Sequence, residues 1–458
     1  MPDVIVVGGG LSGSEAAWQA AEHGSYVQLF EMRPETMTGA HTGPYFAELV
    51  CSNSLGSNMP NRASGLIKEE LRLLGSYVLA CAEQVSVPAG GALAVDRNAF
   101  AHKVTNGIEN HPRIEIVRQE VINIPHDTTT IIASGPLTSK KLSNSIKELT
   151  GEEHLYFYDA LSPIIEYESI NMDIAYKASR YQRGKQKKGD YINCPFSREE
   201  YEEFVNEIKN AERIQLKEFE NGITNGVKSG FHKYFEGCLP IEILAMRGNN
   251  TLAYGPMKPV GLIDPRTGQR PYAVVQLRQD NLAASLYNLV GFQNNLKFSE
   301  QKRVFRLIPG LNSAEFVRFG QMHRNTFIFS PKHLNQSLQF RKQRNLFFAG
   351  QITGVEGYIS NIATGLLAGW NSNRHHRGEE LIIMPRTTMI GALCYYITHA
   401  SPSDFQPMKA NYGILPSLGE NIKRTKLERA EAHKKRSIND TKEIVEIKEK
   451  YKGLSYLR

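Results

Sequence analysis

The chain has 458 residues, of which 41% are hydrophobic and 22% charged, and its formal net charge is +7. Its longest apolar runs fall far short of the roughly 20 residues that span a bilayer, and no signal peptide precedes the first predicted strand. This excludes a membrane-spanning protein and predicts a cytoplasmic one. The five cysteines are scattered without a CxxC pair or Cys/His cluster, so we expect no structural metal. The positive charge permits a polyanionic partner without requiring one.

The first 31 residues have the pattern of a βαβ unit that binds a dinucleotide. A buried strand over 3–7 leads into GxGxxG, an alanine-rich helix ends near Gly24, and a second strand over 26–30 is followed by Glu31. The glycines allow a tight turn, close approach to a pyrophosphate and close helix packing, and the acidic residue accepts hydrogen bonds from ribose hydroxyls. The predicted cofactor-binding residues here are Gly8, Gly9, Gly10, Leu11, Ser12, Gly13 and Glu31.

Two later segments favour FAD over a nicotinamide cofactor as the tightly held group. Residues 131–139, IIASGPLTS, are typical of a strand that crosses behind the cofactor. Residues 345–374 read as a strand, a glycine turn and a small-residue helix whose amino terminus would face the flavin. A dehydrogenase that binds only a nicotinamide cofactor would not need this second strand-turn-helix segment, called the return below. The predicted cofactor-binding residues of the return are Gly350, Gln351, Glu356 and Gly357.

The change in composition and hydrophobic periodicity along the chain predicts a Rossmann-like α/β domain that is interrupted by an inserted domain. Residues 1–195 and 331–420 form the two parts of the FAD-binding domain in this interpretation. Residues 196–330 begin with a charged helical segment and continue as short strands between glycine and proline turns, which is typical of a smaller α+β domain. Residues 421–458 are predicted to be a charged helical tail.

Ten segments together resemble one family, the folate- and FAD-dependent tRNA (uracil-5-)-methyltransferases, from residue 1 to about 420. They are GGGLSGSEAAWQAAEHG, FEMRP, FAELVCSNSL, SGLIKEELRLLGS, PAGGALAVDR, FEGCLPIE, YGPMKPVGL, VQLRQDN, MHRNT and FFAGQITGVEGY. The resemblance implies methylation of uridine 54 in the T-loop of tRNA. It further implies 5,10-methylenetetrahydrofolate as carbon donor and NADH or NADPH as the reductant of FAD. A sister family that modifies wobble uridines resembles the chain less, because its first cysteine lies in an SCNP-like context and its carboxyl-terminal extension is longer.

Two of the cysteines lie in motifs of that family, Cys51 in FAELVCSNSL and Cys238 in FEGCLPIE. Uracil C5 is a poor nucleophile, and a thiolate that adds to C6 transfers negative charge to C5. We expect Cys238 to be this thiolate and Cys51 to assist on the flavin side, with the reverse assignment as the alternative. Cys81 and Cys394 are expected to be buried thiols without chemistry, and Cys194 has no supporting context.

Other polar residues are candidates for binding folate or RNA. Arg278 in QLRQDN and Lys258 in GPMKP could each bind a folate carboxylate. His323 and Asn325 in MHRNT could form a loop at the folate or the flavin edge, and Tyr358 could stack on a pterin or uracil ring. For each of them, a structural or solvated polar residue is the alternative.

Two basic stretches, 176–191 and 423–436, could bind RNA phosphates or could be solvated charged faces. Three other functions remain open at this point: the same chemistry on ribosomal RNA, wobble-uridine modification, and small-molecule flavin oxidation. A non-catalytic FAD-binding module is a further class, which the two motif cysteines disfavour. Neither the oligomeric state nor the choice between NADH and NADPH can be read from the sequence.

Overall fold

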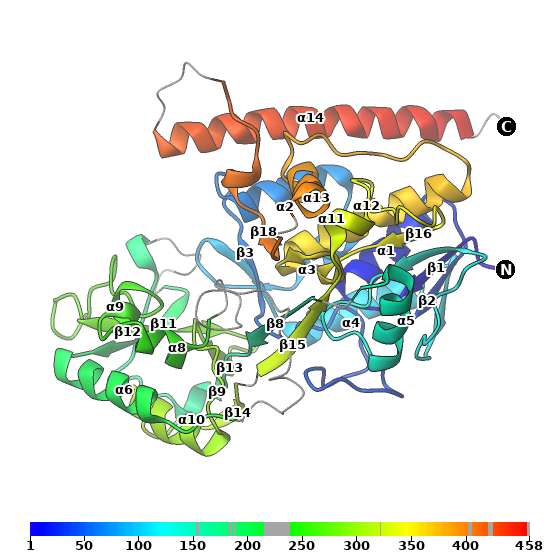
Figure 1. The fold of residues 1–458 in the computed structure, drawn as a ribbon. Helices are drawn as coiled ribbons and strands as arrows, with labels where there is room; N and C mark the ends of the chain where they lie inside the picture. The colour runs from blue at the N-terminus through cyan, green and yellow to red at the C-terminus, as the bar shows by residue number, and fades with distance from the viewer. Residues whose placement is uncertain are drawn as a thin grey trace.

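The fold is described from a computed structural model. It covers residues 1–152, 155–182, 186, 189–214, 239–320, 322–401, 405–419 and 425–455, and of residues 155–160, 322–324 and 447–455 it describes the backbone only. The described elements form two parts, each with its own sheet and core (Figure 1). No helix in the described ranges is long and apolar enough to cross a membrane.

A five-stranded parallel sheet forms the centre of the first part, with strand order β16-β7-β1-β2-β6. The strands are β16 (Leu346–Phe348), β7 (Thr129–Ile132), β1 (Val4–Val7), β2 (Val27–Phe30) and β6 (Ile114–Val117). All four residues of β1 are buried, as expected for a strand covered on both faces. Because β16 pairs with β7 after a long excursion of the chain, the predicted α/β fold with a returning second motif is confirmed.

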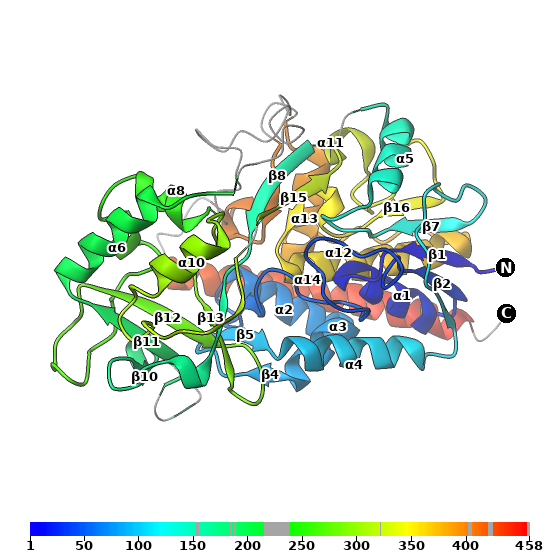
Figure 2. The ribbon, with the colours of Figure 1, turned by 90° about the horizontal axis from the view of Figure 1, so that it is seen from below.

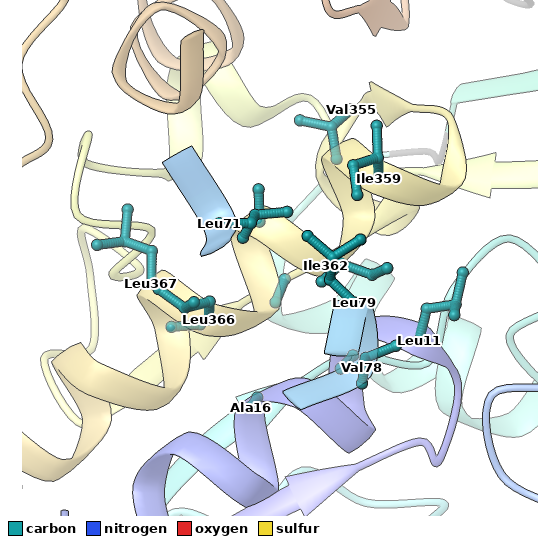
Figure 3. Close-up of a cluster of buried hydrophobic side chains, with 14 of the residues drawn as sticks. Leu11, Ala16, Leu71, Val78, Leu79, Val355, Ile359, Ile362, Leu366 and Leu367 are labelled. Carbon is teal, nitrogen blue, oxygen red and sulfur yellow. The ribbon is translucent and has the colours of Figure 1, made fainter. Parts of the chain in front are cut away.

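Helix α1 (Leu11–Glu22) lies against α12 (Tyr358–His376), the helix of the returning segment. The contact is close: a Cβ atom at Gly365 would lie 2.3 Å from Ser12 O, and one at Gly369 would lie 2.5 Å from Ala16 O. Around it, apolar side chains of α1, α12, α2 (Ala63–Leu74) and α3 (Tyr77–Gln84) pack together (Figure 3). They include Leu11, Leu71, Val78, Leu79, Ile362 and Leu366. The two sequence-distant halves of the cofactor domain therefore share one core.

The second part is built on a six-stranded antiparallel sheet with strand order β10-β11-β12-β13-β9-β14. Its strands are β10 (Tyr176–Ala178), β11 (Tyr191–Phe196), β12 (Ala273–Gln279), β13 (Leu286–Leu289), β9 (Ile164–Glu166) and β14 (Phe316–Arg318). Its helices are α6 (Arg198–Asn210), α8 (Ile241–Met246), α9 (Thr251–Tyr254) and α10 (Phe298–Phe305). Figure 2 shows the antiparallel pair β8 (Leu155–Ala160) and β15 (Met322–Phe327) between the two parts.

The boundary that the sequence predicts between residues 195 and 196 falls inside this second sheet. Strands β9 and β10 precede residue 196, and β11 ends at Phe196, which pairs with Ala273 of β12. Antiparallel pairing joins short strands that lie far apart in the chain. The change in composition and periodicity at the start of α6 therefore does not coincide with the start of the sheet.

A small sheet and the carboxyl-terminal elements complete the first part. The small sheet has the order β3-β5-β4, with β3 (Ser54–Ser57), β5 (Ala92–Val95) and β4 (Ser86–Val87). The remaining elements are α4 (Arg97–Glu109), α5 (Lys140–Thr150), α11 (Ser330–His333), α13 (Met389–His399), β17 (Val355–Glu356), β18 (Met408–Lys409) and α14 (Lys426–Ser455). The long helix α14 packs on α2 (Figure 1).

Buried Glu70 of α2 ties these helices together. Its carboxylate accepts hydrogen bonds from the backbone amides of Met389 (2.6 Å) and Ile390 (2.9 Å) and from the hydroxyl of Ser437 in α14. Burial raises the pKa of Glu70 to about 7, although these hydrogen bonds act to lower it. The charged tail predicted from the sequence therefore includes a helix with a specific attachment to α2.

Candidate functional site

A cleft opens beside the carboxyl ends of β1 and β7, where ligands bind in open α/β sheets. It brings together the three sequence elements that predict FAD: the first glycine loop, the segment after β7 and the return after β16. The lining includes Gly8, Gly10, Leu11, Ser12, Glu31, Ser134, Gly135, Gln351, Glu356, Gly357 and Asn361, together with Cys51, Asn325 and Tyr358. The residues predicted to bind FAD and the candidates Cys51, Asn325 and Tyr358 thus line the same cavity.

The first glycine loop has the geometry that its pattern predicts. Gly8 has a φ of +106°, and a Cβ atom there would lie 2.6 Å from Ala133 O. At Gly13 a Cβ atom would lie 1.7 Å from Gly8 O, which no side chain tolerates. Gly10 differs from both, since a Cβ atom there meets no atom within 4 Å and the residue lines the cleft. The fold itself requires Gly8 and Gly13, whereas the space at Gly10 is available to a ligand.

This difference predicts that Gly10→Ala weakens FAD binding about 10- to 100-fold without destabilising the apoprotein. The φ of Gly10 is −74°, a value that alanine adopts readily, and only a bound pyrophosphate would meet the new methyl group. FAD titration and thermal unfolding of the apoprotein measure the two effects. Gly39→Ala is the matched control, because Gly39 is exposed in a loop and a Cβ atom there also meets nothing within 4 Å. Equal FAD affinity in the two variants would contradict a close approach at Gly10.

Glu31 is buried and held by four donors of the protein itself. Its Oε2 accepts hydrogen bonds from Gly9 N (2.9 Å) and Arg33 Nη2 (3.2 Å), and its Oε1 accepts from Arg33 N and Nε (both 3.0 Å). Burial opposes ionisation of Glu31, but the hydrogen bonds and charge of Arg33 outweigh it and hold its pKa below the ordinary value. Arg33 also pairs with Glu48 at 3.0 Å. Arg33, which was not identified from the sequence, thus orients Glu31, the residue predicted to bind the ribose.

The cleft also receives the amino terminus of α12 from the returning motif and two buried side-chain amides, one from α12 and one from β15. Gly350 has a φ of +81°, and Gly357, with a φ of +90°, precedes α12 without a side-chain cap. Asn361 in the first turn of α12 and Asn325 of β15 are 6% and 1% exposed. Asn361 Oδ1 and both side-chain polar atoms of Asn325 have no hydrogen-bond partner among the described residues. Buried amides of this kind fit a polar ligand such as FAD.

The loop of Cys51 reaches the same cleft and is tied to the start of α12. The backbone amides of Cys51 (2.8 Å) and Ser52 (3.2 Å) both donate to the hydroxyl oxygen of Tyr358. Burial, followed by the neighbouring Cys51, raises the pKa of Tyr358. The predicted stacking of Tyr358 on a pterin or uracil ring stays a prediction; in this structure its hydroxyl positions the half-buried Cys51 beside the cofactor loops.

Three arginines from different elements hold the Cys51 loop from its other side. Arg97 donates to Leu49 O (2.7 Å) and Cys51 O (3.4 Å) and pairs with Asp280 (3.0 Å), and Arg318 donates to Val50 O. Burial lowers the pKa of Arg278 and of Arg318, whereas a negative charge on Cys51 acts in the opposite direction on both. By reciprocity these guanidinium groups favour the thiolate form of Cys51, the form that reacts.

Arg278 contributes the most extensive contacts of the three. Its Nε donates to Asn53 Oδ1 (2.9 Å), and its Nη2 donates to Ser52 Oγ (2.6 Å) and Asn288 Oδ1 (3.2 Å). The side chain is 8% exposed. The predicted contact of Arg278 with a folate carboxylate stays a prediction, while its contacts in the structure hold the loop that carries Cys51.

The remaining predicted residues lie apart from this cluster or outside the described part. Lys258 is exposed in the loop after α9 and is not among the residues that line the cleft. The backbone of His323 pairs with Asp159 across β15 and β8, and its side chain is outside the described part. Cys238 lies outside the described residues, as do Lys185, Lys187 and Lys188 of the first basic stretch.

The other cysteines have structural surroundings. Cys81 is 3% exposed, and Cys194 and Cys394 are fully buried. Burial raises the pKa of all three thiols, that of Cys394 to about 12. Cys81 and Cys394 are thus buried thiols, as the sequence predicted.

Arg97 and Arg318 were not identified from the sequence. Arg97 stands in the segment PAGGALAVDR, which is part of the family resemblance, but no spacing rule connects it with Cys51. Arg318 lies on the short strand β14 of the second sheet, and only the tertiary structure brings it to the loop of Val50.

The parallel sheet, the glycine loop and the returning strand-turn-helix define a flavoprotein of the Rossmann type that binds FAD. The model of the family "Glucose inhibited division protein A" matches residues 3–380. A Brevibacillus brevis protein named Methylenetetrahydrofolate--tRNA-(uracil-5-)-methyltransferase TrmFO is 55% identical over 426 residues, covering 93% of this chain and 94% of that protein. A Pelotomaculum thermopropionicum protein of the same name is 57% identical over 435 residues, covering 95% and 96%. The chain therefore belongs to the glucose inhibited division protein A family and, within it, to the TrmFO enzymes.

Solved structures agree with this fold. The form I crystal structure of Aquifex aeolicus GidA superimposes with a TM-score of 0.67 at 18% identity, covering 99% of this chain and 80% of that one. The form II structure gives a TM-score of 0.68 at 16% identity, with coverages of 96% and 73%. At this identity the likeness concerns the fold, and it confirms that both sheets belong to one recurring architecture.

Proposed function

We propose that this enzyme methylates C5 of uridine 54 in the T-loop of tRNA. The one-carbon unit would come from 5,10-methylenetetrahydrofolate, and NADH or NADPH would reduce the FAD. The names of the similar proteins support the folate donor and the tRNA substrate. The observation that carries the proposal is the position of Cys51, which lines the FAD cleft with its loop held by three arginines and Tyr358.

The cofactor would be held by the glycine loop of residues 8–13 at its pyrophosphate and by Glu31 at its ribose. Asn361 and Asn325 would supply hydrogen bonds to its polar edge, because their buried amide atoms have no partner among the described residues. When bound, FAD supplies reducing equivalents and a position that can take up a one-carbon unit. The amino terminus of α12 favours a partial negative charge on the group beside it.

The residues of the chain would activate the uracil. We assign Cys238 as the thiolate that adds to C6, so that the electron pair of the C5–C6 double bond makes C5 nucleophilic. Once C5 had bonded to the one-carbon unit, a base would remove the C5 proton, and the bond between that carbon and its carrier nitrogen would break. Two reducing equivalents from the NAD(P)H-reduced flavin would bring the carbon to the methyl level, and the Cys238 thiolate would leave C6. Cys51, whose thiolate the surrounding guanidinium groups favour, would assist on the flavin side.

A product assay tests the proposed function. Purified FAD-bound protein is incubated with methylenetetrahydrofolate, NADH or NADPH, and unmodified tRNA, with ribosomal RNA in a parallel reaction. We expect 5-methyluridine in tRNA at position 54, dependent on folate and indifferent to S-adenosylmethionine. Product only in ribosomal RNA would change the substrate and keep the chemistry. Oxidation of NADH without methylated RNA would leave a flavin oxidoreductase.

A further inference from the structure

A second groove lies where the first turns of α14 cross the amino terminus of α2. It has a volume of about 810 Å³. Four of its lining residues carry or can carry positive charge: Arg62, Lys426, Arg429 and His433. No carboxylate is among its described lining residues, and within the described part of the chain neither Arg62 nor Lys426 nor Arg429 forms an ion pair with an acidic side chain. Its charge fits an anionic ligand.

Buried polar atoms inside this groove also lack partners. Asn61 Oδ1 and the hydroxyl of Tyr412 are inaccessible to solvent and make no hydrogen bond with any described residue. The Tyr412 ring lies 5.6 Å from the His433 ring, centroid to centroid. A tyrosine hydroxyl can donate a hydrogen bond to a phosphate oxygen, and neutral His433 can donate one from Nε2 while its Nδ1 lies 3.3 Å from Arg436 Nη2. The groove therefore offers neutral donors in addition to positive charge.

Basic side chains line the groove, while Glu431, outside the lining, acts on Tyr412 in the opposite sense to Arg62. Burial, together with the charges of Arg436 and Arg429, lowers the pKa of His433. The nearby Glu431 pairs with Lys434 at 3.3 Å. Helix α2 begins at Ala63 without a side-chain cap at Arg62, so its amino terminus adds partial positive charge at the same place.

Two segments that line the groove are joined along the chain to segments that line the cleft of Cys51. On one side, Lys409 of β18 lines the cleft, and the next four residues, 410–413, line the groove. On the other side, Cys51, Ser52 and Ser54 line the cleft, and the same chain reaches the groove at Asn61. The two cavities thus adjoin at β18, where Lys409 lines the cleft and Ala410 lines the groove.

We propose that this groove, formed by α2, α14 and residues 410–413, binds backbone phosphates of the tRNA next to the target uridine. The inference rests on the proposed function. The groove has the features of a phosphate contact: exposed lysine and arginine side chains, a helix amino terminus and the hydroxyl of Tyr412. Such contacts hold the RNA in register while the uracil is read in the cleft.

The test compares tRNA binding by the FAD-bound protein and its variants between 50 and 200 mM salt. Arg62→Ala and Arg429→Ala are each expected to weaken binding roughly tenfold. The double variant should reduce the slope of log K against log salt concentration by about two, because two phosphate contacts are lost. Lys442→Ala removes an exposed lysine farther along α14, outside the groove, and should bind tRNA as the wild type does.

Variants are compared at equal FAD content, and thermal unfolding verifies that α14 remains docked. Arg429 is exposed and alanine favours the helix, so this single variant keeps the test valid if Arg62→Ala disturbs α2. Wild-type affinity and salt slope in both single variants and the double variant would overturn the groove proposal. If the wild type makes 5-methyluridine in that case, the proposed function stands and only the groove is wrong. If the wild type makes none, the proposed function itself fails.

Discussion

Cys238→Ala is expected to abolish the covalent complex with tRNA that contains 5-fluorouridine and to lower turnover about a thousandfold or more. Fluorine at C5 withdraws electrons and stabilises the adduct of a thiolate at C6, and after alkylation of C5 it cannot leave as a proton does. The bond from the thiolate to C6 therefore persists and can be detected on a denaturing gel. Without the Cys238 thiolate, no such bond forms. Cys51→Ala is expected to lose methyl transfer to a similar extent while still forming the complex, because we place Cys51 on the flavin side.

Cys81→Ala serves as the matched control for removal of a thiol. Cys81 is 3% exposed and does not line the cleft, so its replacement should leave both trapping and methyl transfer intact. FAD content, measured from the flavin absorbance, shows whether each variant keeps its cofactor. A Cys238→Ala protein that still forms the complex, together with a Cys51→Ala protein that does not, would reverse the two roles.

Arg278→Met is expected to lower the free energy of unfolding by about 3 kcal/mol and to reduce turnover strongly. Methionine removes the donors to Ser52, Asn53 and Asn288, and hydrogen bonds from a charged group contribute roughly 1.5–3 kcal/mol each. The variant no longer pays the desolvation cost of a buried guanidinium, which offsets part of the lost hydrogen-bond energy. The expected net decrease in the free energy of unfolding is therefore close to the contribution of one or two such bonds. Urea unfolding of the FAD-bound protein measures the stability, and steady-state kinetics measure turnover.

The same variant separates the two roles considered for Arg278. If it holds the Cys51 loop, stability and kcat fall and the KM for methylenetetrahydrofolate changes little. If it binds a folate carboxylate instead, that KM rises while stability is retained. Arg278→Lys should not rescue the loop, because a single ammonium cannot reproduce the fork of contacts. Arg270→Met, an exposed arginine in the second part, controls for loss of a positive charge.

The sequence by itself determined the cofactor half of this protein. The spacing of Gly8, Gly10 and Gly13 and the return through Gly350 and Gly357 specify local backbone conformations. At Gly8 and Gly350 the positive φ values, and at Gly13 a distance of 1.7 Å from a hypothetical Cβ to Gly8 O, exclude nearly every other residue. Such requirements are local, so a short motif is enough to reveal them.

The tertiary structure alone decided the second sheet and the surroundings of Cys51. The sheet is assembled from short strands whose partners lie far apart in the chain, and no local pattern marks that β9, before residue 196, pairs with β13 and β14. In the same way, Arg97 from α4 and Arg278 and Arg318 from the second sheet meet at the loop of residues 49–53 because the second sheet lies against this loop. Hydrogen bonds between distant residues follow from packing, which residue spacing does not encode. For that reason the sequence identified Cys51 and Arg278 separately, but neither their association nor Arg97 and Arg318.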